Sequence, residues 1–100
     1  MPIRVASIAT ALATKTAAYT LTATDSVILA DATSAAFTLT LPSASGITGR
    51  QYTIKKVDSS ANAVTIASVA GTIDGAATKA LSAQWQAARV VSDGGNWFMV

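Results

Sequence analysis

The chain has 100 residues, a net charge of +2 and no histidine or cysteine, so it suits one compact domain without disulfides. The missing histidine removes the commonest general base and the commonest metal ligand, and the sequence predicts neither an enzyme nor a cofactor or metal site. Charged residues are 12% of the chain, the positive charges are dispersed, and no apolar run reaches the roughly 18 residues of a membrane span, which argues against nucleic-acid and membrane binding.

The N-terminal segment, residues 1–15, is predicted to be an arm that precedes a single β domain at residues 16–100. Val5, Ile8 and Leu12 would form one stripe of a helix, but a short isolated helix is marginal in water. We therefore favour an extended arm or edge strand that packs on another protein, with a frayed terminus as the alternative. Threonines interrupt the apolar residues, so the segment is interpreted as a mature N-terminus and not as a signal peptide.

From residue 16 onwards, short stretches of alternating or continuous apolar residues are separated by turn residues, which predicts β-strands. The stretches are 19–22, 26–32, 37–41, 49–57, 63–67, 72–73, 78–81, 84–92 and 97–100. About nine short strands at this spacing indicate an all-β domain, a β-sandwich or jelly roll of antiparallel strands. The sequence contains no internal repeat that would predict a solenoid.

Three of these stretches carry specific predictions. Residues 49–66 are predicted to form one β-hairpin, because apolar and polar residues alternate on both sides of a polar turn at 58–62. The apolar run at 26–32 predicts a strand that is buried on both faces. The last stretch, 97–100, is predicted to pair with an internal strand, so that its deletion abolishes folding.

The acidic residues are few and separated. All five lie in or beside predicted turns: Asp25, Asp31, Asp58, Asp74 and Asp93. Paired carboxylates would suit a glycosidase or a calcium site, but aspartate in a turn usually caps backbone N–H groups, and capping is the prediction for each. A serine nucleophile would need Lys55, Lys56 or Lys79 as its base, and no motif supports that pairing.

The two tryptophans are the largest apolar residues of the chain. Four residues of the stretch 84–92 share one face of the predicted strand: Trp85, Ala87, Arg89 and Val91. Trp85 and Trp97 both lie in apolar stretches, so packing in the core or at an interface is the prediction for both. Gln84 and Gln86 flank Trp85, and for this residue alone a sugar-stacking contact stays open.

Four motifs stand out along residues 16–100. They are LP at 41–42, GRQYTIKKVDSSANAVTI at 49–66, IDG at 73–75 and SDGGNW at 92–97. Together they resemble a small β module of bacteriophage virion proteins, most often found in tail fibres and tail spikes. The resemblance implies an all-β domain that usually works as a trimer and has no enzymatic activity of its own. Because only residues 1–15 precede the module here, the chain looks more like a head decoration (cement) protein or a short head fibre than a long fibre.

The leading expectation is a phage virion structural protein on the capsid surface, a homotrimeric decoration protein that stabilises the head by bridging subunits of the major capsid protein. The arm is expected to anchor it through Pro2, Ile3, Val5, Ile8 and Leu12. The alternative is a tail fibre or spike module that recognises host surface glycans through Gln84, Trp85 and Gln86. Neither function requires a cofactor, a metal, nucleic acid or a membrane.

Overall fold

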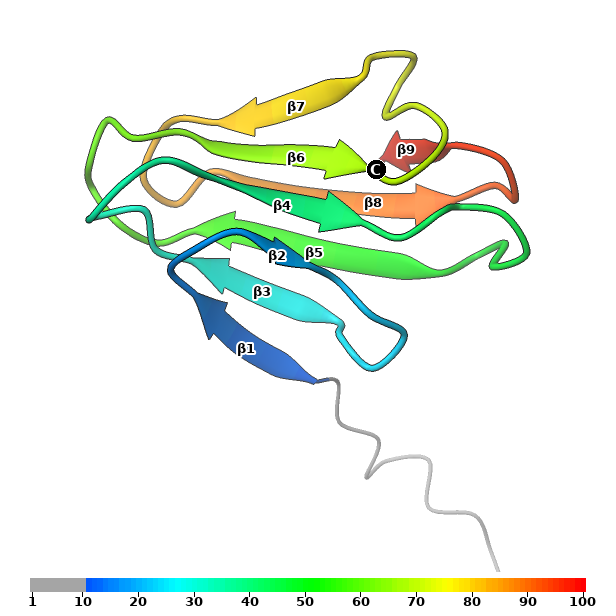
Figure 1. Ribbon diagram of the computed structural model, residues 1–100, viewed down its shortest axis with the longest axis horizontal. Coiled ribbons are helices and arrows are strands. Elements are labelled where there is room, and N and C mark those ends of the chain that lie inside the picture. Colours follow the sequence, from blue (N-terminus) through cyan, green and yellow to red (C-terminus); the bar gives the residue numbers. More distant parts are fainter. Residues whose placement is uncertain (1–10) are drawn as a thin grey trace, which may run out of the picture.

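The computed structural model describes residues 11–100, which form nine β-strands and no helix (Figure 1). The strands are β1 (Leu12–Lys15), β2 (Tyr19–Thr20), β3 (Val27–Ala30), β4 (Phe37–Leu41), β5 (Gln51–Lys56), β6 (Val64–Ser68), β7 (Thr78–Leu81), β8 (Ala87–Ser92) and β9 (Trp97–Met99). They form a five-stranded sheet, β1-β3-β5-β8-β9, and a four-stranded sheet, β2-β4-β6-β7. The predictions of an all-β domain and of about nine strands are confirmed, and this part of the chain contains no helix that could cross a membrane.

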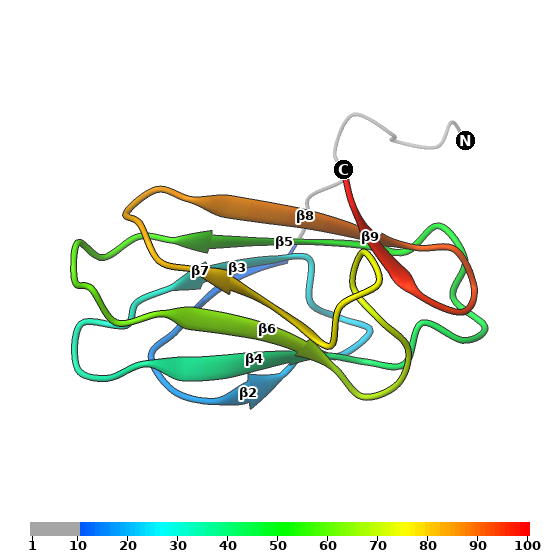
Figure 2. The ribbon, with the colours of Figure 1, turned by 90° about the horizontal axis from the view of Figure 1, so that it is seen from above.

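The chain alternates between the two sheets over its first six strands (Figures 1 and 2). β1, β3 and β5 are neighbours in one sheet, β2, β4 and β6 are neighbours in the other, and these four pairs are all parallel. Among the described strands, β5–β8, β6–β7 and β8–β9 are the antiparallel pairs. The prediction of antiparallel strands is therefore wrong for four of the seven pairs, because consecutive strands enter opposite sheets and each runs beside the strand after next.

The stretch 49–66 is not a hairpin, because β5 lies between β3 and β8 whereas β6 lies in the other sheet between β4 and β7. Its polar turn bonds across the molecule instead. Asp58 Oδ1 accepts the N–H of Ala32 (2.8 Å), and Asn62 Nδ2 donates to the carbonyl oxygen of Ala32 (2.8 Å). These bonds hold the β5–β6 connection against the β3–β4 connection, so both connections cross between the sheets at the same end of the molecule.

The turns and the closing strand of the C-terminal part follow the predictions. Asp74 and Gly75 have φ angles of 49° and 79°. Two backbone hydrogen bonds between Ile73 and Ala76 (2.8 and 3.0 Å) enclose them, as in the two-residue turns typical of hairpins. In the β8–β9 turn, the side chain of Asp93 accepts two backbone N–H groups. β9 pairs with β8, an internal strand of its sheet, as predicted.

One hydrophobic core lies between the sheets and takes side chains from both. Figure 2 shows β5 and β8 on one side of it and β4 and β6 on the other. Trp97 and Tyr52 are its largest side chains, and their ring centroids are 5.6 Å apart. Trp97 Nε1 donates to the carbonyl oxygen of Pro42 (3.1 Å), which gives the buried indole a partner. Core packing is confirmed for Trp97.

β3 is buried on one face only. Ile28 and Ala30 are fully buried against the core, whereas Val27 and Leu29 point away from it and are half-buried. The prediction that residues 26–32 are covered on both faces is therefore wrong. The reason is that the far side of the five-stranded sheet is open to solvent along several of its strands, β1, β8 and β9 among them.

Candidate functional site

The predicted anchoring residues fall at the start of the chain. Four of them lie outside the described residues: Pro2, Ile3, Val5 and Ile8. The fifth, Leu12, opens β1, the edge strand of the five-stranded sheet, and pairs in register with Val27 of β3. Its side chain is 61% exposed. The one anchoring residue that the structure describes is thus an exposed apolar side chain on a sheet edge, within a segment predicted as an extended arm or edge strand.

The predicted sugar-contact residues Gln84, Trp85 and Gln86 form the turn before β8, not part of a strand. Trp85 has a φ of 69°, a conformation that bulky residues rarely adopt, and its side chain is 59% exposed. The prediction that Trp85 packs in the core is therefore wrong. The backbone N–H of Trp85 donates to the carbonyl oxygen of Lys56 (2.7 Å), which ties the turn to β5 and keeps the indole out of the core.

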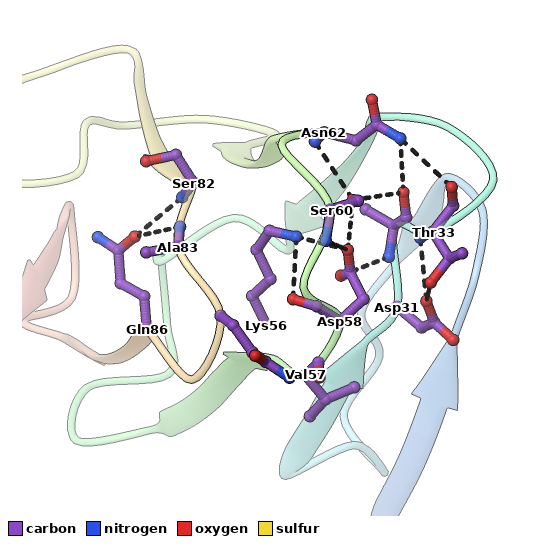
Figure 3. Close-up of polar contacts among 12 residues, drawn as sticks. Asp31, Thr33, Lys56, Val57, Asp58, Ser60, Asn62, Ser82, Ala83 and Gln86 are labelled. Atoms are coloured by element: carbon purple, nitrogen blue, oxygen red, sulfur yellow. Dashed lines mark hydrogen bonds and ion pairs between the residues drawn. The ribbon is translucent and has the colours of Figure 1, made fainter.

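The two glutamines beside Trp85 stabilise this turn. Gln86 Oε1 accepts the N–H groups of Ser82 (2.8 Å) and Ala83 (3.2 Å), as Figure 3 shows. Gln84 Nε2 donates to the carbonyl oxygen of Val57 (3.3 Å). The side-chain groups that a sugar would need are thus partly committed to the protein itself. What remains beside the exposed indole is Lys55, whose Nζ lies 5.8 Å from the centroid of the Trp85 ring.

A buried ion pair lies next to this turn (Figure 3). Lys56 Nζ is 2.7 Å from Asp58 Oδ2, and the two side chains are 0% and 4% exposed. Lys56 points inward because it shares the core side of β5 with Tyr52 and Ile54. Asp58 Oδ2 also accepts the backbone N–H (3.0 Å) and the hydroxyl of Ser60. With Oδ1 bound to the N–H of the β3–β4 connection, both oxygens of the carboxylate are engaged.

The protonation of Asp58 follows from these contacts. Burial alone would raise the pKa of Asp58, but the hydrogen bonds from Lys56, from Ser60 and from the backbone of Ala32 outweigh it and hold the pKa well below its usual range. The carboxylate is therefore charged at neutral pH and saturated with donors. Lys56 is committed to it, so this lysine is not placed as the base of a serine nucleophile. The arrangement ties two connections together and offers no free reactive atom.

The turn-capping prediction is confirmed for Asp25, Asp31, Asp58 and Asp93, whose side chains accept backbone N–H groups of their own turns, whereas Asp74 accepts one from β9 instead. The donors are Thr22 for Asp25, Thr33 for Asp31, Ala32 and Ser60 for Asp58, Met99 for Asp74, and Gly95 and Asn96 for Asp93. Within residues 11–100, no three acidic side chains gather as a metal site would require, and no pocket is found. The described part of the chain thus presents surfaces and not a cleft.

The most distinctive surface is the side of the five-stranded sheet that points away from the core, here called the outer face. It comprises Leu12, Thr14, Val27, Leu29, Gln51, Thr53, Lys55, Ala87, Arg89, Val91, Phe98 and Val100. The chain has five exposed large apolar side chains among the described residues, and three of them, Leu12, Phe98 and Val100, belong to this face. A fourth, Trp85, stands beside its residue Lys55.

The four-stranded sheet has no such apolar residues on the side that points away from the core. Its residues that point away from the core are Thr20, Thr38, Thr40, Thr65, Ala67, Thr78 and Ala80, and none is large and apolar. The apolar character is therefore specific to the outer face. A partial signal for it exists in the sequence, since Trp85, Ala87, Arg89 and Val91 were predicted to share a face; only the pairing of β1, β3, β5, β8 and β9 shows that this face extends over the whole sheet.

Comparison with protein-family models and with curated proteins finds no match for the chain. Function must consequently be inferred from the surfaces just described and from the motifs that resemble the virion module. Of these surfaces, the outer face is the one whose composition points to a partner.

Proposed function

We propose that this chain is a structural protein of a bacteriophage virion, a homotrimeric capsid decoration (cement) protein without enzymatic activity. In this role it would sit on the capsid surface and stabilise the head by bridging subunits of the major capsid protein. The observation that carries the proposal is the outer face, because several exposed large apolar side chains on one face of a small domain are typical of a surface that binds another protein.

The motifs behind the virion resemblance support the proposal because they occupy positions that build this fold. Pro42 of the LP motif accepts the indole N–H of Trp97 from SDGGNW. IDG forms the tight turn at Asp74-Gly75, and the aspartate of SDGGNW caps the β8–β9 turn. We assign the two sheets that enclose the core to the β-sandwich class, while the four parallel pairs set the connectivity apart from a jelly roll.

The proposed mechanism is mechanical. A closed cyclic trimer presents three copies of the same surface, so a trimer seated at a three-fold or quasi-three-fold position of the shell meets equivalent capsid neighbours. Removing it requires several contacts to break together, which raises the avidity far above that of one contact. The arm adds to these contacts, and it joins the sheet at Leu12 on the outer face.

Two measurements test this function. Electron microscopy of virions carrying a labelled copy is expected to place the label on the head, and a label confined to the tail would contradict the decoration role. Sedimentation equilibrium of the purified protein is expected to give the mass of three chains. A stable, well-dispersed single chain would contradict the trimer.

Deletion of residues 1–10 tests the arm. β1 begins at Leu12, so the deletion keeps all nine described strands, and a folded trimer is expected. Loss of the apolar contacts of Ile3, Val5 and Ile8 should weaken head binding at least about tenfold, the effect of burying one or two such side chains. Co-sedimentation with heads measures the binding, and circular dichroism checks the fold. Binding equal to that of the full chain would exclude the arm as an anchor.

One observation favours the second candidate, a tail fibre or spike module that binds host glycans. Trp85 exposes an aromatic ring of the kind that stacks on sugars, with Lys55 beside it. A glycan array probed with the purified protein separates the two functions. A decoration protein is expected to bind no glycan, whereas a signal that disappears in Trp85→Asn would favour receptor recognition.

A further inference from the structure

The charged side chains of the outer face have one sign. Its charged residues are Lys55 and Arg89, and it contains no acidic residue. We propose that the outer face, together with Trp85, docks on an apolar protein surface of a different protein that carries carboxylates opposite Arg89 and Lys55. The inference rests on the proposed function, under which this surface belongs to the capsid and not to a second copy of this chain.

The registers of the strands show that the face is continuous. Leu12, Val27, Thr53 and Arg89 are aligned across β1, β3, β5 and β8, and the N–H of Val100 bonds to the carbonyl oxygen of Arg89 (2.8 Å). This row therefore runs across the full width of the sheet. On one side of it lies the row Thr14, Leu29, Lys55 and Ala87, and on the other side lies the row Gln51, Val91 and Phe98.

Arg89 is placed as an anchor within this surface. Its neighbours on the face are small or apolar, with Thr53 and Val100 in its row and Ala87 and Val91 along its strand. The single ion pair among the described residues joins Lys56 and Asp58, so no carboxylate of residues 11–100 pairs with Arg89. A guanidinium fork can bind a carboxylate of a partner through two parallel hydrogen bonds, which makes arginine a favoured residue for ion pairs at interfaces.

Trp85 is placed as the second anchor. Two backbone hydrogen bonds with Lys56 hold its left-handed backbone. The N–H of Trp85 donates to the carbonyl oxygen of Lys56 (2.7 Å), and the N–H of Lys56 donates to the carbonyl oxygen of Gln86 (2.9 Å). The side chain of Gln86 closes the same turn. The backbone of the turn is therefore held before any partner arrives, which lowers the ordering cost of binding. Tryptophan and arginine are the residues most enriched among the contacts that dominate protein interfaces.

The same charges argue against a second copy of this chain as the occupant. Stacking two outer faces would bring Lys55 and Arg89 of both copies together without an acidic side chain on either face to pair with them. The acidic residues of the chain all lie in turns outside the strands, and each already accepts a backbone N–H of its own chain. A second copy therefore offers no flat acidic surface on which the outer face could pack. A glycan fits less well, because the apolar side chains of Leu12, Val27, Phe98 and Val100 offer its hydroxyls no hydrogen-bond partner.

The test compares variants of the full chain for binding to phage heads that lack this protein. Arg89→Glu reverses the charge at an exposed position, and Thr78→Glu places the same new side chain at an exposed position of β7 in the other sheet as the control. Trp85→Asn removes the indole, while asparagine tolerates the left-handed backbone, so the fold is kept. We expect Arg89→Glu and Trp85→Asn each to weaken head binding at least about tenfold and Thr78→Glu to stay within about twofold of the wild type.

Sedimentation equilibrium and circular dichroism of the same variants complete the test. The expected result is an unchanged oligomer and fold with reduced head binding. Heads that bind Arg89→Glu and Trp85→Asn as well as wild type would overturn the outer face as the docking site and leave the decoration function intact. Dissociation of the oligomer by Arg89→Glu would show that a second copy covers this face, and a glycan signal lost in Trp85→Asn would show a sugar; either overturns the inference. Wild-type protein that does not bind heads would overturn the proposed function itself.

Discussion

Lys56 shows what alternation along a strand can predict and what it cannot. Tyr52 and Ile54 point into the core, and period two places Lys56 on the same side, where it is fully buried. A lysine is rarely buried unless it is paired. The partner, Asp58, lies in the connection that follows the strand, and its position depends on Ala32, which no local pattern relates to it. The inward position was therefore predictable from the sequence, but the ion pair was not.

Lys56→Met tests the energetic role of this pair. The substitution keeps an apolar stem of similar length and leaves the carboxylate of Asp58 buried without its cation. We expect the free energy of unfolding to fall by roughly 3 kcal/mol, the usual cost of removing one partner of a buried pair. Urea denaturation measures it, and Lys55→Met on the outer face is the matched control, which should change little. Equal stability of the two variants would show that the ammonium group does not support the fold.

Gly71 illustrates a constraint of another kind. Its φ is +87°, and a Cβ atom there would come within 2.6 Å of the carbonyl oxygen of Gly95. Gly75 has a similar φ of +79°, but a Cβ atom there meets nothing within 4 Å. We expect Gly75→Ala to cost about 1–2 kcal/mol through backbone strain alone. Gly71→Ala should lower the free energy of unfolding clearly more, since the backbone at Gly95 must also move. Urea midpoints compare the two, and identical losses would mean that the close approach is unimportant.

At the scale of elements, the strands were predictable and their partners were not. Alternation places β4, β5, β6 and β8 within a few residues of their observed ends, because each has one buried face. The same alternation suits a hairpin and a crossing between sheets equally well, and this is why residues 49–66 were mispredicted. The number of residues between paired parallel strands also differs from one pair to the next. The sequence therefore has no fixed period from which the parallel pairing could be predicted. For the same reason only the part of the outer face on residues 84–92 could be foreseen, since the whole face exists only once five strands are aligned.

β9 is the element whose loss should be most damaging. Trp97 fills the core beside Tyr52, and its backbone also bonds to Thr72 and Asp74, so this strand closes the sheet and holds the neighbouring turn. Removing the indole alone costs about 3–5 kcal/mol, comparable with the entire stability of many small domains. We expect deletion of residues 97–100 to abolish the cooperative thermal transition seen by near-ultraviolet circular dichroism. Deletion of the exposed Val100 alone is the control and should preserve it.

At the scale of the whole molecule, the capped turns make stability depend on pH. Hydrogen bonds lower the pKa values of Asp31 and Asp93, and for Asp25 and Asp58 such bonds outweigh the opposing effect of burial. Each of these carboxyls is a stronger acid in the folded state than in the unfolded chain. Each therefore contributes stability that is fully present above the unfolded pKa of about 4 and is lost as the pH falls through the folded value.

Urea denaturation as a function of pH checks this dependence. We expect the midpoint to be nearly constant from about pH 5 to 8 and to fall progressively below about pH 4. Asp58→Asn, which lacks the most strongly shifted carboxyl, should show a shallower fall than the wild type, although it starts from a lower midpoint. A midpoint that rises on acidification, or a slope that is the same in both proteins, would contradict the role of these carboxylates.

The alternation of the chain between sheets has a consequence for how the molecule assembles. No strand from β1 to β5 pairs with the strand that follows it, so each of their contacts must wait for a later segment and be closed over a long loop. Such non-local order places folding in the slow range of milliseconds to seconds for a chain of this size. On the ribosome, β5 receives its second neighbour only when residues 87–92 have emerged, so the five-stranded sheet cannot be completed before that point.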